Sequence, residues 1–127
     1  IVEDEFVGRV FLQEVLSQYG RCDIAINGTE ALDLFKLAMK QNEPYDLICL
    51  DIMMPNMDGQ QVLKEIRRIE EQDGIMGLAG VKIIMTTALG DLNNIKTAFK
   101  EQCDAYLVKP IIKEKLMGTI REFGLIE

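Results

Sequence analysis

The sequence predicts an α/β fold, a doubly wound parallel sheet of five strands with five helices on its two faces. Short apolar runs alternate with longer amphipathic segments along the whole chain, which is typical of strand–helix–strand units. Because connections between parallel strands are right-handed, few arrangements remain, and we expect the strand order 2-1-3-4-5. At 127 residues the chain has the size of one domain, so residues 1–127 are expected to form a single domain.

The expected strands are short and apolar, as strands covered by helices on both faces are. They are residues 1–2, 22–26, 45–50, 81–87 and 105–108. The first contains only Ile1 and Val2, and the chain starts without a methionine. We therefore expect that the beginning of this strand is missing from the sequence.

The expected helices carry apolar side chains at three- and four-residue spacing. They span residues 6–19, 27–39, 59–71, 91–100 and 113–123. Residues 73–80 form a glycine-rich connection that is longer than such a link requires. The charged residues before it, Glu70, Glu71 and Asp73, are expected to form a solvated helix end.

The composition excludes several classes of function. The formal net charge is −7, which argues against a nucleic-acid or anionic membrane surface, because both need clustered Lys and Arg. The chain has no His, and its cysteines, Cys22, Cys49 and Cys103, are widely spaced, so neither a zinc site nor a His-based triad is expected. No apolar stretch is long enough to span a bilayer. Free thiols fit a reducing cytoplasm, where we expect the protein to act.

Charged or hydroxyl side chains follow four of the expected strands. Glu3 and Asp4 follow the first, Asp51 the third, Thr87 ends the fourth, and Lys109 follows the fifth. The carboxyl ends of parallel strands open onto one edge of the sheet, where sites of such folds form. We therefore expect these side chains to lie close together.

This combination of groups predicts a site for phosphoryl oxygens. Carboxylates about 5 Å apart repel by roughly 3 kcal/mol per pair at an effective dielectric near 20, so a hard cation such as Mg²⁺ is expected among them. Lys109 adds a second positive charge and Thr87 a hydroxyl donor. Asp51 is the central carboxylate and hence the candidate nucleophile.

With these motifs in place, the chain resembles the receiver domains of two-component response regulators, which have a flavodoxin-like fold. The resemblance covers essentially the whole chain in the right order. The matching residues are Glu3-Asp4, Asp51, Met54-Pro55, Asp58-Gly59, Thr87-Ala88 and Ala105-Tyr106-Leu107-Val108-Lys109-Pro110. Two positions depart from the family, since Glu3 replaces the commoner Asp and Ile111 stands where an aromatic residue is frequent.

The resemblance implies a role for each acidic residue. Asp51 would accept a phosphoryl group from a phosphohistidine on a sensor kinase or a phosphotransfer protein. Asp4 and Asp51 would bind Mg²⁺ (or Mn²⁺) together with the backbone carbonyl of Met53, and Glu3 would assist through a water molecule.

The resemblance also implies a switch. Lys109 would pair with the phosphoryl group, and the Lys109–Pro110 peptide is expected to be cis. Thr87 would swing to hydrogen-bond the phosphate, and Tyr106 would then move inward. The face formed by the segments 91–100, 105–108 and 113–123 would change its affinity for partners, as a two-state population shift.

We expect output by protein contact, from a regulator that is no enzyme beyond its own phosphorylation and dephosphorylation. Because no output segment follows the last helix, a stand-alone regulator is expected, with a receiver excised from a larger output protein as the alternative. Dimer formation on phosphorylation is an option that the sequence leaves open.

Two other interpretations compete. A phosphatase of the haloacid dehalogenase type also uses an Asp nucleophile, but such enzymes have a second Asp where this chain has Met53, and their acidic pair follows the nucleophile.

The structural alternatives are that the acidic residues merely favour a helix N-terminus, that Thr86 replaces Thr87, and that Tyr106 is an ordinary packed aromatic.

Overall fold

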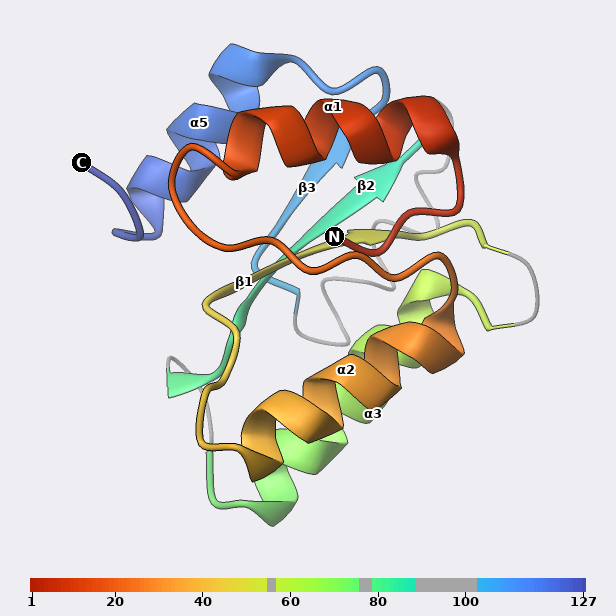
Figure 1. Ribbon diagram of the computed structural model, residues 1–127, viewed down its shortest axis with the longest axis vertical. Helices are drawn as coiled ribbons and strands as arrows, with labels where there is room; N and C mark the ends of the chain where they lie inside the picture. Colours follow the sequence, from red (N-terminus) through yellow and green to blue (C-terminus); the bar gives the residue numbers. More distant parts are fainter. Residues whose placement is uncertain (55–56, 76–78, 89–102) are drawn as a thin grey trace.

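A computed structural model describes residues 1–54, 57–75, 79–88 and 103–127. Its centre is a parallel sheet in the order β1-β2-β3 (Figure 1). The strands are β1 (Leu47–Asp51), β2 (Lys82–Thr87) and β3 (Ala105–Val108). The register pairs Asp51 with Thr86, and Thr87 with Val108. The carboxyl ends of all three strands therefore lie at one edge of the sheet.

The first two expected strands are represented by single parallel bridges. Val2 bridges Ala25 on one side and Leu50 of β1 on the other. The Val2 N–H donates to the Cys49 carbonyl at 2.8 Å, and the Asp51 N–H donates to the Val2 carbonyl at 3.0 Å. These bonds fix the residue that follows Val2 beside the end of β1.

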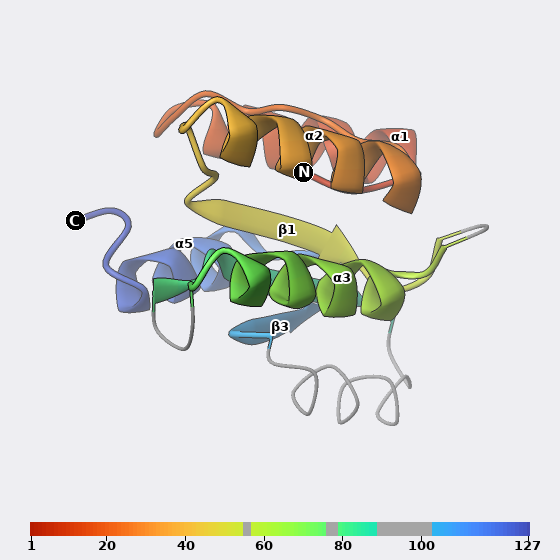
Figure 2. The same ribbon diagram turned by 90° about the horizontal axis from the view of Figure 1, so that it is seen from below.

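Four described helices cover the two faces of the sheet. On one face lie α1 (Phe6–Leu16) and α5 (Lys113–Glu122), and on the other lie α2 (Gly28–Lys40) and α3 (Gly59–Gln72) (Figures 1 and 2). The expected helix at 91–100 lies outside the described residues. None of the helices in the described ranges is long and apolar enough to cross a membrane.

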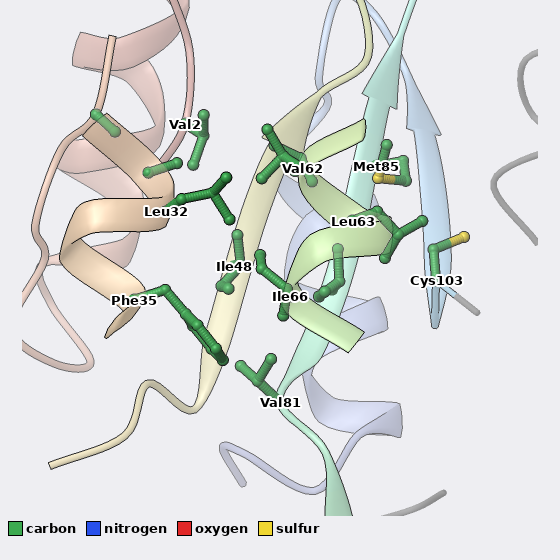
Figure 3. Packing of buried hydrophobic residues seen from close by; sticks show 14 of the residues in the cluster. Val2, Leu32, Phe35, Ile48, Val62, Leu63, Ile66, Val81, Met85 and Cys103 are labelled. Atoms are coloured by element: carbon green, nitrogen blue, oxygen red, sulfur yellow. The ribbon is translucent and has the colours of Figure 1, made fainter. Parts of the chain in front are cut away.

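The core has two parts, one for each face of the sheet. The part under α2 and α3 includes Phe35, Ile48, Leu63, Ile66 and Met85 (Figure 3). The part under α1 and α5 takes the alternate strand residues, such as Cys49 and Ile84. Because successive strand residues point to opposite faces, an uninterrupted apolar run fills both parts, which is what the sequence of β1 predicts.

Two local expectations are corrected by the structure. The first helix ends at Leu16, so Tyr19 lies beyond it, and both Phe6 and Tyr19 are exposed, with 68% and 51% of their surfaces accessible. Glu70 is not part of a solvated helix end, because it is 4% exposed. Its carboxylate accepts from Arg67 Nη1 and from the Val81 N–H, both at 2.7 Å, so it joins α3 to the start of β2.

Candidate functional site

The expected charged side chains meet at the carboxyl edge of the sheet. Asp51 ends β1, Glu3 and Asp4 follow the bridge at Val2, and Lys109 follows β3. One carboxylate oxygen from each of the three acidic residues lies within 4.8 Å of the others. Residues from three distant parts of the chain therefore form one cluster.

Lys109 provides the counter-charge in this cluster. Its Nζ lies 2.8 Å from Glu3 Oε1 and 3.2 Å from Asp51 Oδ2. The Lys109 N–H donates to the Thr87 carbonyl at 2.7 Å, which ties the lysine to the end of β2. The Lys109–Pro110 peptide is cis, as the resemblance to receiver domains implies.

The cluster holds more negative charge than Lys109 neutralises. Glu3 and Asp51 are each 3% exposed. Burial, followed by the hydrogen bond with Asp51, raises the pKa of Glu3 to about 8, although Lys109 opposes the shift. Burial alone would lower the pKa of Lys109, but its hydrogen bond to Glu3 and the charge of Asp51 raise it.

The arrangement fits a divalent cation. Among the described residues, the buried side-chain atom without a hydrogen-bond partner is Glu3 Oε2, and an orphaned buried carboxylate oxygen calls for a positively charged partner. Three clustered carboxylates supply oxygen ligands, which suit hard divalent ions. Asp4 is exposed, so solvent ligands could reach an ion held here.

Contacts from neighbouring segments fix the chain around the cluster. Arg9 Nη1 donates to the carbonyls of Glu3 and Asp4 at 3.2 and 2.8 Å. Asp58 caps α3 in a reciprocal capping box with Gln61, which stabilises the helix start. At Gly59, a Cβ would lie 2.2 Å from the Asp51 carbonyl oxygen, so only glycine permits this approach.

The remaining expected site residues lie nearby, in different settings. Met53 donates its N–H to Asp51 Oδ1 at 3.2 Å, so its loop folds back on the central carboxylate. Thr87 is fully buried at the end of β2, and in the described part of the chain its hydroxyl donates to the Ala88 carbonyl at 3.3 Å instead of to the cluster. Tyr106 lies on β3 and is 39% exposed. Pro55 lies outside the described residues.

Sequence reasoning missed Gly8 and Arg9. The position of Gly8 within a helical pattern is the available signal, because an isolated glycine there often marks a close approach. A hollow lined by residues such as Tyr19, Tyr45 and Ile126 lies at the start of β1, and none of the expected site residues lines it.

Comparison with known proteins identifies the family of this chain. Residues 1–121 match the family described as the response regulator receiver domain. The chain is 33% identical over 123 residues to the chemotaxis protein CheY of Halobacterium salinarum, and this match covers 96% of the chain and 92% of that protein. It is 39% identical over 122 residues to the probable transcriptional regulator ycf27 of Guillardia theta, over 95% of the chain but 42% of that protein. The chain thus spans less than half of the length of this relative.

Solved structures show the same fold. The receiver domain of Ssk1 from Saccharomyces cerevisiae, co-crystallised with the histidine phosphotransfer signalling protein Ypd1, is similar to this chain. The TM-score is 0.82 at 30% identity, over 97% of this chain and 85% of that chain. A receiver domain protein from Clostridium thermocellum gives a TM-score of 0.78 at 25% identity, over 96% and 89% of the two chains.

Proposed function

This chain belongs to the response regulator receiver domain family of two-component signalling, and we propose that Asp51 is its phosphoacceptor. The observation that supports this assignment is the position of the Asp51 carboxylate. It ends β1, contacts Lys109 Nζ at 3.2 Å, and shares a cluster with the oxygens of Glu3 and Asp4. A nucleophile, a lysine and a candidate cation site thus meet at one point.

In the proposed reaction, an Asp51 carboxylate oxygen forms a bond to phosphorus, and the bond from phosphorus to the donor group breaks. A bound Mg²⁺ would neutralise the charge that develops on the phosphoryl oxygens. Glu3, Asp4, Asp51 and the Met53 carbonyl are the residues that would hold it. Lys109 is placed to pair with a phosphoryl oxygen on Asp51, because its Nζ already lies beside Oδ2.

The proposed switch runs from Thr87 to β3 and α5. The Thr87 carbonyl accepts from the Lys109 N–H, and Thr87 pairs in register with Val108. A shift at the end of β2 on phosphorylation would therefore reach β3, where Tyr106 lies. Tyr106 and Val108 are 39% and 38% exposed, so this surface can present a changed face to an output partner. The third part of the expected face, residues 91–100, lies outside the described residues.

We also propose the finer arrangement of the sheet. The two bridges of Val2 extend the described order, so that Ala25, Val2, β1, β2 and β3 lie side by side. This sequence supports a five-stranded sheet in the order 2-1-3-4-5 with helices on both faces.

The proposed donor is a sensor histidine kinase or a histidine phosphotransfer protein. Relatives of this chain include the osmosensing histidine protein kinase SLN1 of Saccharomyces cerevisiae, of which the match covers 10%, and the similar Ssk1 receiver was crystallised with a phosphotransfer protein. On this chain, Phe6 and Val7 lie in the first turn of α1, directly after the acidic residues, and are 68% and 71% exposed. Such apolar side chains beside the site suit a protein partner.

The experiment that tests this function is incubation of the protein with acetyl phosphate and Mg²⁺, followed by mass spectrometry. A receiver gains one labile phosphoryl group, on Asp51. A phosphatase with an Asp nucleophile would instead hydrolyse a generic phosphate monoester over many turnovers. We expect labelling with negligible turnover, because the receiver is proposed to catalyse only its own phosphorylation and dephosphorylation.

A further inference from the structure

Gly8 stands in α1 at a position where the helix itself does not require glycine. Glycine is less favourable than alanine in a helix interior. Among the described glycines, those with positive φ are Gly74 and Gly124, so backbone conformation does not explain Gly8. The reason must lie in what surrounds the residue.

The space that a side chain would need at Gly8 is filled by Glu3. A Cβ at Gly8 would lie 2.6 Å from Glu3 Oε1, 3.3 Å from its Cγ and 3.4 Å from its Cδ. The first distance is too short for any real contact, so a substitution would force the carboxylate to move.

The Glu3 carboxylate cannot move away from Gly8 without losing its contact with Lys109. Its side chain is 3% exposed, and the oxygen that a Cβ would displace, Oε1, is the atom that accepts from Lys109 Nζ at 2.8 Å. Its other oxygen, Oε2, is buried without a hydrogen-bond partner, and Glu3 shares a carboxylate cluster with Asp4 and Asp51. Moving Oε1 therefore breaks the lysine contact and shifts the Glu3 carboxylate relative to Asp4 and Asp51.

We infer that Gly8 is a positioning residue, which makes room for a glutamate at position 3 and sets its two oxygens against Lys109 and the cation cluster. The consequence for cation binding rests on the proposed function. The packing of Gly8 against Glu3 does not, because it is a contact between protein atoms alone. The absence of a side chain at Gly8 leaves the space that the longer side chain of Glu3 occupies.

The test is a double-substitution cycle with Gly8→Ala and Glu3→Asp, singly and together, and Mg²⁺ affinity measured by isothermal titration calorimetry. Gly8→Ala should weaken Mg²⁺ binding by about tenfold or more, the usual effect of disturbing a residue that orients a metal ligand. In the Glu3→Asp background, the same substitution should change the affinity by less than about twofold, because the shorter side chain leaves room for Cβ. Gly118→Ala is the matched control, since α5 offers open space there, and its affinity should equal that of the unsubstituted chain.

Each outcome supports or overturns the role of Gly8 in positioning Glu3. An equal loss of affinity in both backgrounds, or no loss in either, would overturn the inference. If Gly8→Ala alone does not fold, folding of the double variant supports the inference, and failure of both variants overturns it. If the unsubstituted chain does not bind Mg²⁺, the proposed function is contradicted. Gly8 is then tested by metal-free unfolding, in which Gly8→Ala should lower the urea midpoint only when Glu3 is present.

Discussion

Lys109 Nζ lies 2.8 Å from Glu3 Oε1, although 106 positions separate the two residues in the sequence. The contact forms because the bridge at Val2 and the end of β3 bring both residues to the same edge of the sheet. It leaves the second Glu3 oxygen buried and unpartnered. The site therefore gathers three carboxyl groups around one lysine, and a bound cation would relieve their repulsion.

Without metal, the folding stability of the protein should fall as the pH rises. Glu3 has a pKa of about 8 in the folded protein, whereas its ordinary value, which applies to the unfolded chain, is 4.5. Between pH 4.5 and about 8, the Glu3 carboxyl group is therefore protonated in the folded state and ionised in the unfolded state. The Glu3 contribution to stability is therefore fully present below pH 4.5 and is lost as the pH rises to about 8. Urea unfolding at pH 5 and pH 8 without metal should show this decrease, and Glu3→Gln should make it smaller. An equal decrease in both proteins would refute the assignment to Glu3.

Mg²⁺ binding should release a proton for the same reason. A metal ligand must be deprotonated, whereas Glu3 is largely protonated below pH 8 in the metal-free protein. Calorimetry at pH 7 in buffers of different ionisation enthalpy should give a binding heat that depends on the buffer. Glu3→Gln should remove this dependence, and a dependence that persists in the variant would place the proton elsewhere.

Lys109→Met should destabilise the metal-free protein more at pH 8 than at pH 5. At pH 8, near the pKa of Glu3, the substitution removes the cation that faces the Glu3 and Asp51 carboxyl groups and pushes the pKa of Glu3 further up. The loss of such a buried pair costs up to about 3 kcal/mol. At pH 5 Glu3 is protonated and needs the lysine less. Urea unfolding measures both values, and Lys40→Met, at an exposed position of α2, is the control. A loss of the same size at both pH values would contradict this account.

Gly59→Ala should destabilise the protein strongly. Its Cβ would lie 2.2 Å from the Asp51 carbonyl oxygen and 2.8 Å from the Ile52 Cα, and backbone atoms cannot move aside as a side chain can. We expect a loss of about 1–3 kcal/mol in unfolding free energy, as for other overpacked sites. Gly118→Ala, with nothing within 4 Å, should instead gain about 0.5–1 kcal/mol from helix propensity. Equal effects of the two substitutions would show that the contact with Asp51 is unimportant.

Val7→Ser should slow phosphotransfer from a phosphorylated histidine phosphotransfer protein without changing labelling by acetyl phosphate. Val7 is 71% exposed in the first turn of α1, so it is available to a protein donor but not needed by a small one. Single-turnover transfer monitored by loss of the donor's label gives the rate. Leu37→Ser, at an exposed position of α2, should leave both reactions unchanged. Equal transfer rates for the two variants would exclude this part of α1 as the docking surface.

Much of this site could be predicted because its chemistry lies at strand ends. The apolar runs at β1 and β2 identify buried parallel strands, and the topology then brings the residues that follow them to one edge. The cluster of Glu3, Asp4 and Asp51 with Lys109 was predicted in this way. The cis peptide before Pro110 came from the family resemblance alone.

The features that the sequence did not reveal depend on distances between particular atoms. Glu70 was expected to be solvated because charged residues at helix ends usually are, but Arg67 and the Val81 N–H satisfy its carboxylate in the interior. Phe6 fits the apolar periodicity of α1, yet it is the first residue of the helix and is 68% exposed. The role of Gly8 could not be found from periodicity, because it depends on where the Glu3 carboxylate lies.

The most direct test of the central claim is phosphoryl labelling of Asp51→Asn. The asparagine side chain has nearly the same shape, so circular dichroism should show an intact fold, and the loss of one buried negative charge should not reduce stability. With acetyl phosphate and Mg²⁺, the unsubstituted protein should gain one labile phosphoryl group while Asp51→Asn gains none. Full labelling of the folded variant would contradict the assignment of Asp51 as the phosphoacceptor.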